Sequence, residues 1–357
     1  MAKRSETALG AGFSGVGQKQ MIIPKKMKKL LSSAILLSVL CAATAFGAET
    51  SAKAATVGFI PKLDTDPYFG VAKSGAEEAQ KEIGGKVIQE APSRATGDAQ
   101  IEFINNLVSE RVDVIAIAGN DPNAVAPALK RAQQQGVRVI SYDSDVAKSA
   151  RGIFVNQVNF DTVAQQMLES MGNLIGYQGE FAILSSTATA TNQNAWIASM
   201  KKALASDPKF AQMKLVQVAY GEESEQVNQQ QALALVQAFP NLKGIIIPAG
   251  IGLPAAARAL EQAGLLKKIK LTGLAPALLM KKYILDGSAQ DIWWNVQDLG
   301  YLTYYAAQAY AQGKITGKKG ETFAAGRLGN YTIGDDGQVI LGPAVIVTPE
   351  NVDKFKF

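Results

Sequence analysis

One loop of this chain combines a cation, a carboxylate and two neighbouring aromatic rings. It follows the apolar run at residues 56–60 and carries Lys62, Asp66, Tyr68 and Phe69. Charged groups can bond to the hydroxyls of a small molecule, and aromatic faces pack well on the apolar C–H face of a sugar ring. Ordinary packing of the two rings at the start of a helix is the alternative. The loop therefore indicates a binding site for a small, hydroxyl-rich molecule.

Two more loops that follow apolar runs carry polar side chains. One holds Asn120, which could instead cap the next helix, as could Asp121. The other holds Asp143 and Asp145. Two carboxylates could act as acid and base on a sugar. A binding role is favoured, because an aspartate at the end of a strand can accept two hydroxyl hydrogen bonds and so orient a polyol.

A fourth loop, at residues 185–196, is rich in small hydroxylated residues. Its last part holds Asn192, Gln193 and Asn194, whose amides suit a neutral hydrogen-bonding ligand better than an ion. The stretch Trp294-Asn295 adds one more aromatic face and one more amide. We predict that these loops share one site.

Two residue types that many enzymes use for catalysis, histidine and cysteine, are missing from most of the sequence. There is no histidine, and the single cysteine, Cys41, lies in an N-terminal segment considered below. This excludes the commonest general base, a thiol nucleophile and the usual zinc sites. Gly250-Ile251-Gly252 lacks the third glycine of a dinucleotide-binding loop. The pair Asp335-Asp336 suits a hairpin turn better than a calcium loop. We predict no catalytic residue, metal or cofactor.

Short apolar runs alternate with amphipathic stretches from residue 55 onward, which predicts an α/β fold. Strands are expected at residues 56–60, 86–90, 112–118, 137–142, 152–156, 180–185, 214–219, 244–248, 268–273 and 290–295. Helices are expected at residues 99–109, 123–135, 162–174, 194–205, 226–239 and 254–263. Strands separated by helices form parallel sheets that bind ligands at their carboxyl ends.

Ten strands are too many for one sheet with helices of this spacing, so we predict two similar lobes, each a parallel sheet flanked by helices. The first lobe is assigned residues 55–158 and 297–329, and the second residues 159–296 and 330–357. The tail is expected to hold a helix at 299–311 and strands at 330–333 and 339–347, joined by a turn at 334–337. Several crossings between lobes would form a hinge beside a ligand-binding cleft.

The first 47 residues have the pattern of a cleavable signal peptide. Four lysines at positions 25–29 precede an apolar run at 30–43, and small residues follow at Ala45 and Gly47. A membrane anchor is the alternative, but the apolar run is shorter than the ~20 residues that a spanning helix needs. If Met21 or Met27 is the natural start, residues 1–20 are an N-terminal extension. We therefore predict export to the periplasm.

Removal of residues 1–47 changes the charge balance. Of the 36 basic and 31 acidic residues, seven basic residues and one acidic residue lie in this segment, which leaves 29 and 30. The basic character of the whole chain thus belongs to the leader, and we expect no nucleic-acid partner. The mature chain would contain no cysteine and would need no disulfide in an oxidising compartment.

Several stretches together resemble the periplasmic sugar-binding proteins of ABC transporters, of the ribose-binding class, and within it the rhamnose-binding and autoinducer-2-binding branch. The resemblance extends from about residue 55 to the end of the chain. The stretches that carry it are Phe59-Ile60-Pro61-Lys62, Asn120-Asp121-Pro122, residues 127–132, residues 136–139, Tyr142-Asp143-Ser144-Asp145, residues 191–196 and Trp294-Asn295.

The resemblance implies the type I periplasmic binding protein fold. It also implies ligand contacts from Lys62, Asp143, Asn192, Gln193 and the backbone around Pro248 to Gly250. The autoinducer-2 branch has an acidic residue in place of Asn192, which favours L-rhamnose, with autoinducer-2 or another deoxy- or pentose sugar as alternatives. The implied partners are a small neutral sugar and a membrane permease, and the protein is expected to act as a monomer.

Two other functions remain open at this stage. A sugar-responsive transcription regulator shares the two-lobed core, but it needs a helix-turn-helix ahead of that core and no export signal. A periplasmic sugar-processing enzyme is the second alternative, and the absence of histidine disfavours it.

Overall fold

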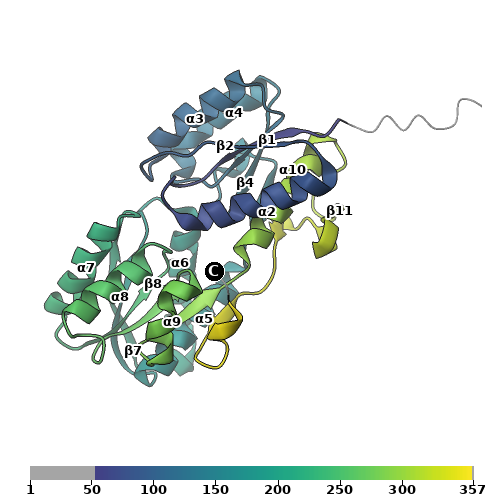
Figure 1. Cartoon of the computed structure of the whole chain (residues 1–357). Helices are drawn as coiled ribbons and strands as arrows, with labels where there is room; N and C mark the ends of the chain where they lie inside the picture. Colours follow the sequence, from purple (N-terminus) through teal and green to yellow (C-terminus); the bar gives the residue numbers. More distant parts are fainter. Residues whose placement is uncertain (1–52, 356–357) are drawn as a thin grey trace, which may run out of the picture. The chain divides into compact units, whose positions relative to one another are not determined.

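The computed structural model describes residues 53–355, which form two α/β lobes (Figure 1). The predicted signal peptide at residues 1–47 lies outside the described residues. The sheet of the first lobe has the strand order β13 (Gln338–Ile340), β5 (Ile153–Asn156), β4 (Arg138–Tyr142), β3 (Val114–Ile117), β1 (Thr56–Ile60) and β2 (Lys86–Gln89). Every pair of neighbours in this sheet is parallel.

The sheet of the second lobe has its strands in the corresponding spatial order. Its strands are β14 (Val345–Val347), β10 (Ala289–Trp293), β9 (Lys270–Leu274), β8 (Leu242–Ile247), β6 (Gly179–Ser185) and β7 (Met213–Tyr220). All pairs are parallel except β14 with β10. The predicted fold of two lobes built on parallel sheets is confirmed.

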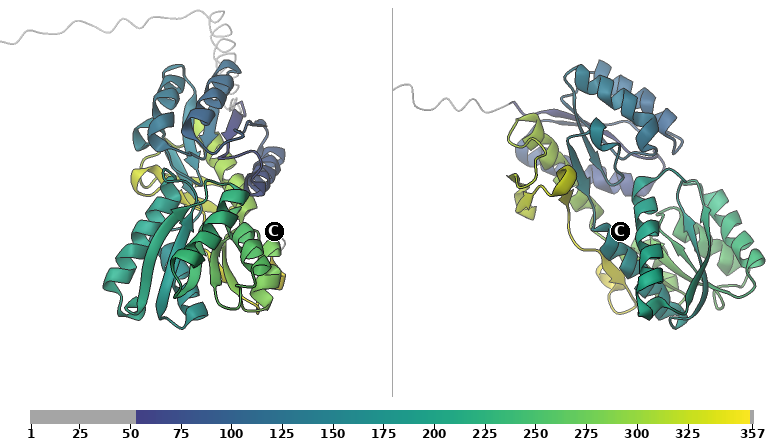
Figure 2. Two further views of the ribbon diagram at one scale, coloured as in Figure 1. Left: turned by 90° about the vertical axis from the view of Figure 1, so that its left-hand side faces the viewer. Right: turned by 180° about the vertical axis from the view of Figure 1, so that it is seen from behind.

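Helices cover both faces of each sheet because successive strand residues point to opposite sides. In β6, Phe181 and Ile183 pack in one apolar cluster while Ala182 and Leu184 pack in another. The helices of the first lobe are α2 (Pro67–Ile83), α3 (Gly97–Ser109), α4 (Pro122–Gln134) and α10 (Val296–Ala311). Those of the second are α5 (Phe160–Ile175), α6 (Thr191–Ser206), α7 (Glu225–Ala238), α8 (Gly252–Gln262) and α9 (Ala277–Leu285). Both lobes thus have three layers (Figure 2).

The chain crosses between the lobes three times, at residues 157–159, 294–295 and 341–344. After the second crossing, α10 packs closely against α2 (Figure 1). Glycines allow this approach: a Cβ on Gly75 would lie 1.8 Å from the carbonyl oxygen of Gln297, and one on Gly300 would lie 1.7 Å from that of Ala72. This crossing is therefore firmly attached to the first lobe.

The prediction for the tail was wrong in three respects. The strand at 330–333 does not pair with residues 339–347, because β12 (Asn330–Thr332) pairs with β11 (Thr322–Ala324). Residues 338–340 join the sheet of the first lobe, although they were assigned to the second lobe. The expected strand at 339–347 is two strands, because β13 pairs with β5 of one lobe and β14 with β10 of the other. Asp335 and Asp336 form ion pairs with Lys319 and Lys148, and no metal-binding cluster occurs among the described residues.

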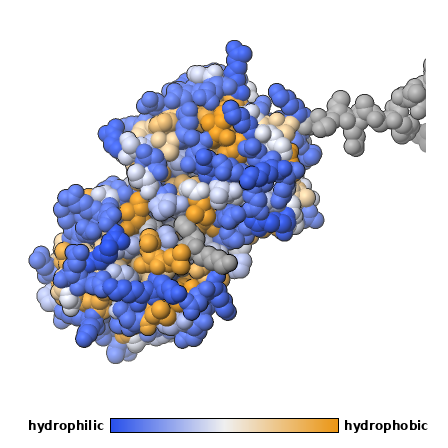
Figure 3. All heavy atoms as spheres, viewed as in Figure 1, coloured by the Kyte–Doolittle hydropathy of each residue, from blue (hydrophilic) through white to orange (hydrophobic). Residues whose placement is uncertain are grey.

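The surface carries one group of exposed leucines on α9. Leu278, Leu279 and Leu285 are each about half exposed, and apolar residues are visible over this part of the second lobe in Figure 3. Within residues 53–355, no helix has both the length and the apolar character needed to cross a bilayer.

Candidate functional site

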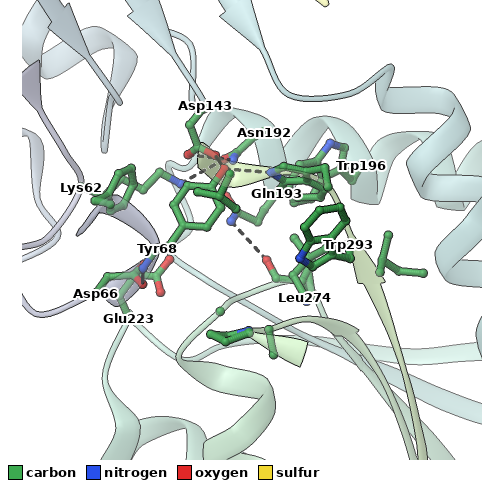
Figure 4. A pocket seen from close by; sticks show the side chains of 18 residues that line it. Lys62, Asp66, Tyr68, Asp143, Asn192, Gln193, Trp196, Glu223, Leu274 and Trp293 are labelled. Atoms are coloured by element: carbon green, nitrogen blue, oxygen red, sulfur yellow. Dashed lines mark hydrogen bonds between the residues drawn. The ribbon is translucent and has the colours of Figure 1, made fainter. Parts of the chain in front are cut away.

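A cavity lies between the lobes at the carboxyl ends of the strands, with both lobes contributing to its wall (Figure 4). It leaves about 590 Å³ free of protein atoms, part of which is open to solvent. The lining residues are Lys62, Asp66, Tyr68, Phe69, Asp143, Asn192, Gln193, Trp196, Glu223, Pro248, Gly250, Leu274, Ala275, Pro276, Ile292, Trp293, Trp294 and Val296. This position is where parallel α/β sheets bind small molecules.

Lys62 connects the two lobes across the cavity. Its buried Nζ donates to Asn192 Oδ1 at 3.1 Å and to Gln193 Oε1 at 3.2 Å, both in the first turn of α6. Gln193 Nε2 in turn donates to the carbonyl oxygen of Pro248 at 3.2 Å. These bonds join side chains from opposite lobes, so they can form only when the lobes are closed.

Asp143 ends a chain of hydrogen bonds that starts at an aromatic residue of the second crossing. Trp294 Nε1 donates to the Tyr68 hydroxyl at 3.0 Å, and that hydroxyl donates to Asp143 Oδ1 at 2.9 Å. Asp143 has a positive φ of 58°, a strained conformation for a non-glycine residue. Burial raises the pKa of Asp143, an effect that the charge of Lys62 partly offsets. Burial likewise raises the pKa of Tyr68 well above its usual value.

Aromatic rings form much of the remaining wall. Tyr68 and Trp294 meet edge to face with ring centroids 6.4 Å apart, and Trp196 and Trp294 do so at 6.1 Å. Phe69 packs against Tyr68 at 5.1 Å. Edge-to-face packing fixes the orientation of such rings. The cavity therefore offers flat apolar surfaces next to a set of hydrogen-bonding groups.

Two carboxylates from opposite lobes also line the cavity. Asp66 is the N-cap of α2 and accepts a hydrogen bond from the backbone N–H of Tyr68 at 3.0 Å. Glu223 lies in the loop between β7 and α7, where Ser186 donates its hydroxyl to Oε1. Burial and then the nearby charge of Glu223 raise the pKa of Asp66 to about 7. This end of the cavity is acidic.

Comparison with known proteins identifies the family. Residues 57–315 match the model of the periplasmic binding protein domain, which is well over half of the chain. The chain belongs to the periplasmic binding protein family. The predicted resemblance to substrate-binding proteins of ABC transporters is thereby confirmed, and so is the prediction of a binding protein as opposed to an enzyme.

Solved structures of this family resemble the protein over most of its length. An ABC transporter solute-binding protein from Clostridium phytofermentas with bound L-rhamnose is 37% identical, with a TM-score of 0.82, over 85% of this chain and 98% of that one. LsrB from Clostridium saccharobutylicum in complex with AI-2 is 26% identical, with a TM-score of 0.78, over 85% and 100%. A relative found by sequence, a D-ribose/D-allose-binding protein from Pseudomonas aeruginosa, is 25% identical over 73% of this chain and 85% of its own.

Ten of the fourteen residues that the sequence predicted for the site line the cavity of this binding protein. The ten are Lys62, Asp66, Tyr68, Phe69, Asp143, Asn192, Gln193, Pro248, Gly250 and Trp294. They come from both lobes and from five separate segments of the chain. The structure thus brings together residues that are up to 232 positions apart, as Lys62 and Trp294 are.

The other four predicted residues lie outside the cavity wall. Asn120 donates to the backbone carbonyl of Lys62 at 2.9 Å and so holds the first loop in place. Asp145 forms a buried ion pair with Arg151 at 2.6 Å. Asn194 donates to the carbonyl of Ala188 at 2.8 Å, and Asn295 caps α10. Each has its polar group committed to the protein itself.

The prediction from sequence missed eight lining residues, which are Trp196, Glu223, Leu274, Ala275, Pro276, Ile292, Trp293 and Val296. Most are apolar, and in a sequence an apolar residue beside a strand indicates core packing. Trp196 follows the predicted Asn192 by four positions and so shares its face of α6, which was an available signal. Glu223 had none, because its loop resembles an ordinary start of a helix.

Proposed function

We propose that the protein captures a small neutral sugar between its lobes, with L-rhamnose as the first candidate, and delivers it to the permease of an ABC transporter. The observation that carries this proposal is the set of cross-lobe hydrogen bonds from Lys62 to Asn192 and Gln193. A ligand that contacts such groups in both lobes stabilises the closed form, whereas one that contacts a single lobe shifts nothing.

The wall of the cavity suits a carbohydrate. Lys62, Asp143, Asn192 and Gln193 supply charged and amide groups for hydroxyls, and the carbonyl of Pro248 supplies an acceptor. The tryptophan and tyrosine rings supply flat faces for the C–H side of a sugar ring. We propose these residues as the ligand contacts.

L-Rhamnose is favoured by two observations. The Clostridium phytofermentas protein, whose structure contains bound L-rhamnose, is 37% identical to this chain. Position 192 holds asparagine, whereas the resemblance described in the sequence analysis implies an acidic residue there in the autoinducer-2 branch. Autoinducer-2 and other pentose or deoxy sugars are the alternatives. We also propose residues 1–47 as the export signal, which would place a monomeric mature protein in the periplasm.

A thermal-shift screen tests the proposal. The mature protein, starting at Ala48, is heated with L-rhamnose, ribose, xylose, fucose or autoinducer-2, because a ligand that binds only the folded state raises the Tm. Titration calorimetry then ranks the sugars that raise it. We expect L-rhamnose to give the largest increase. A Tm that no sugar changes would contradict sugar binding, and turnover of a sugar would indicate an enzyme.

A further inference from the structure

The acidic end of the cavity contains one carboxylate from each lobe, Asp66 and Glu223, which we call the acidic pair. Figure 4 shows the two side chains at the same end of the cavity, away from Asn192 and Gln193. Asp66 begins a helix of the first lobe, and Glu223 follows the edge strand β7 of the second. Closure of the lobes therefore brings two like charges toward each other.

The acidic pair has unused hydrogen-bonding capacity. Glu223 uses Oε1 to accept from Ser186, but its Oε2 is buried and has no hydrogen-bond partner among the described residues. Asp66 uses Oδ1 to accept from the backbone of Tyr68. A buried carboxylate oxygen without a donor is costly, because it has lost water and gained nothing in return.

No cation of the cavity wall neutralises the acidic pair. Lys62 is the only basic residue among the lining residues, and its Nζ donates to Asn192 and Gln193. The pKa of Asp66 reflects this: burial, Glu223 and Asp143 raise it, the backbone N–H of Tyr68 lowers it, and the charge of Lys62 lowers it least. A molecule that fills the cavity can supply the donor that Glu223 Oε2 lacks.

The backbone around Glu223 supports a specific purpose for this side chain. Glu222 and Glu223 both have positive φ, at 52° and 50°, a conformation that non-glycine residues adopt rarely and at a cost. Strain of this kind is retained where the surrounding structure holds a side chain in a set direction. Glu222 shares the strain but is exposed and does not line the cavity.

We propose that Glu223 is a specificity-determining residue, which together with Asp66 accepts hydroxyl donors from one end of the sugar. Each carboxylate comes from a different lobe, so hydroxyls that bond to both fasten the lobes together at a point distant from Lys62. A sugar without hydroxyls at this end leaves two like charges facing each other in the closed form and is rejected. This inference rests on the proposed function.

Calorimetric titration of three proteins tests the proposal at pH 8: the wild type, Glu223→Gln and the matched control Glu222→Gln. The probe is L-rhamnose, or the sugar with the largest thermal shift if that is another. We expect Glu223→Gln to bind at least about tenfold more weakly, because a charge-assisted hydrogen bond becomes a neutral one. The control should stay within twofold of the wild type. Affinity of Glu223→Gln equal to or above that of the wild type overturns the proposal.

A series of monodeoxy sugars gives a second readout. The wild type should bind one of the monodeoxy sugars more weakly than the parent sugar, because the hydroxyl that bonds to Glu223 is missing. Glu223→Gln should bind that deoxy sugar and the parent sugar with similar affinity, because its own bond to this hydroxyl is already weak. Asp66→Asn keeps an N-cap acceptor for α2 and should show the same loss of discrimination. If both variants keep the wild-type deoxy profile, the proposal is wrong. Failure of the wild type to bind any sugar would instead contradict the proposed function.

Discussion

Replacement of Lys62 by methionine tests whether closure of the lobes and sugar binding are coupled through the cross-lobe hydrogen bonds. The side chain of methionine is unbranched like that of lysine and one atom shorter, and it has neither the charge nor the donors. Lys62 is only 4% exposed, and its two partners lie on the opposite lobe. The bonds exist in the closed form only, so their free energy contributes to closure and hence to sugar affinity.

The size of the effect follows from the bonds that are lost. A hydrogen bond with one charged partner contributes about 1.5–3 kcal/mol. Gln193 keeps its bond to the carbonyl of Pro248, so part of the network survives, and we expect a loss of about 2–3 kcal/mol. That corresponds to a Kd roughly 30- to 150-fold higher, which calorimetric titration with the preferred sugar measures directly.

Lys73→Met is the matched control. Lys73 lies on α2 of the same lobe, with a side chain that is 41% exposed and 3.4 Å from Glu77. Surface pairs of this kind contribute about 0–1 kcal/mol, and Lys73 does not line the cavity. An affinity of Lys62→Met within threefold of this control would refute the coupling. The Tm without sugar should stay close to wild type in both variants, which separates lost binding from lost folding.

Three further predictions concern other contacts of the described residues. Two threonines of the second lobe donate hydroxyl hydrogen bonds to backbone carbonyls of the first lobe: Thr189 to Asn120 at 2.8 Å and Thr191 to Asp145 at 2.9 Å. Neither threonine lines the cavity, yet replacing both by valine should weaken sugar binding about tenfold, as measured by calorimetry, because both bonds stabilise the closed form. Arg151→Met leaves Asp145 buried without its partner, and we expect unfolding by denaturant to show a loss of about 3–5 kcal/mol with sugar affinity unchanged. The closed form raises the pKa of Asp66 to about 7 from the usual 3.8, so between these pH values the closed form binds more protons than the open form. Lowering the pH from 8 to 5 should therefore favour closure and reduce the radius of gyration of the sugar-free protein in small-angle scattering. An unchanged radius would contradict this.

Much of the fold was predictable because each lobe obeys local rules. Buried strands such as β3 and the last three residues of β8 are continuous apolar runs, and the stretches between the strands have the spacing of apolar residues that helices need. The tail was not predictable in this way. Residues 339–347 are apolar except for Gly342-Pro343, a break that the sequence does show. What the sequence does not show is that the two halves pair with different sheets, β13 with β5 and β14 with β10.

The site was predictable where a polar residue directly follows an apolar strand, as with Lys62 and Asp143. The same signal could not separate Asp143 from Asp145, because what distinguishes them is the ion pair of Asp145 with Arg151, six residues later. Glu223 could not be found at all. Its place in the cavity depends on a positive φ, and Ser224 and Glu225 beside it have the types expected at the start of any helix.

The three crossings between the lobes constrain the order in which the protein can become complete. Helix α10 and strand β13 belong to the first lobe, yet they follow the entire second sheet except β14 in the sequence. A ribosome makes the chain from its N-terminus, so the first lobe lacks its last helix and an edge strand until about residue 340 has been synthesised. The nascent chain thus stays without a finished domain for nearly the whole of translation, which keeps it accessible to chaperones and other factors that act on unfolded polypeptides.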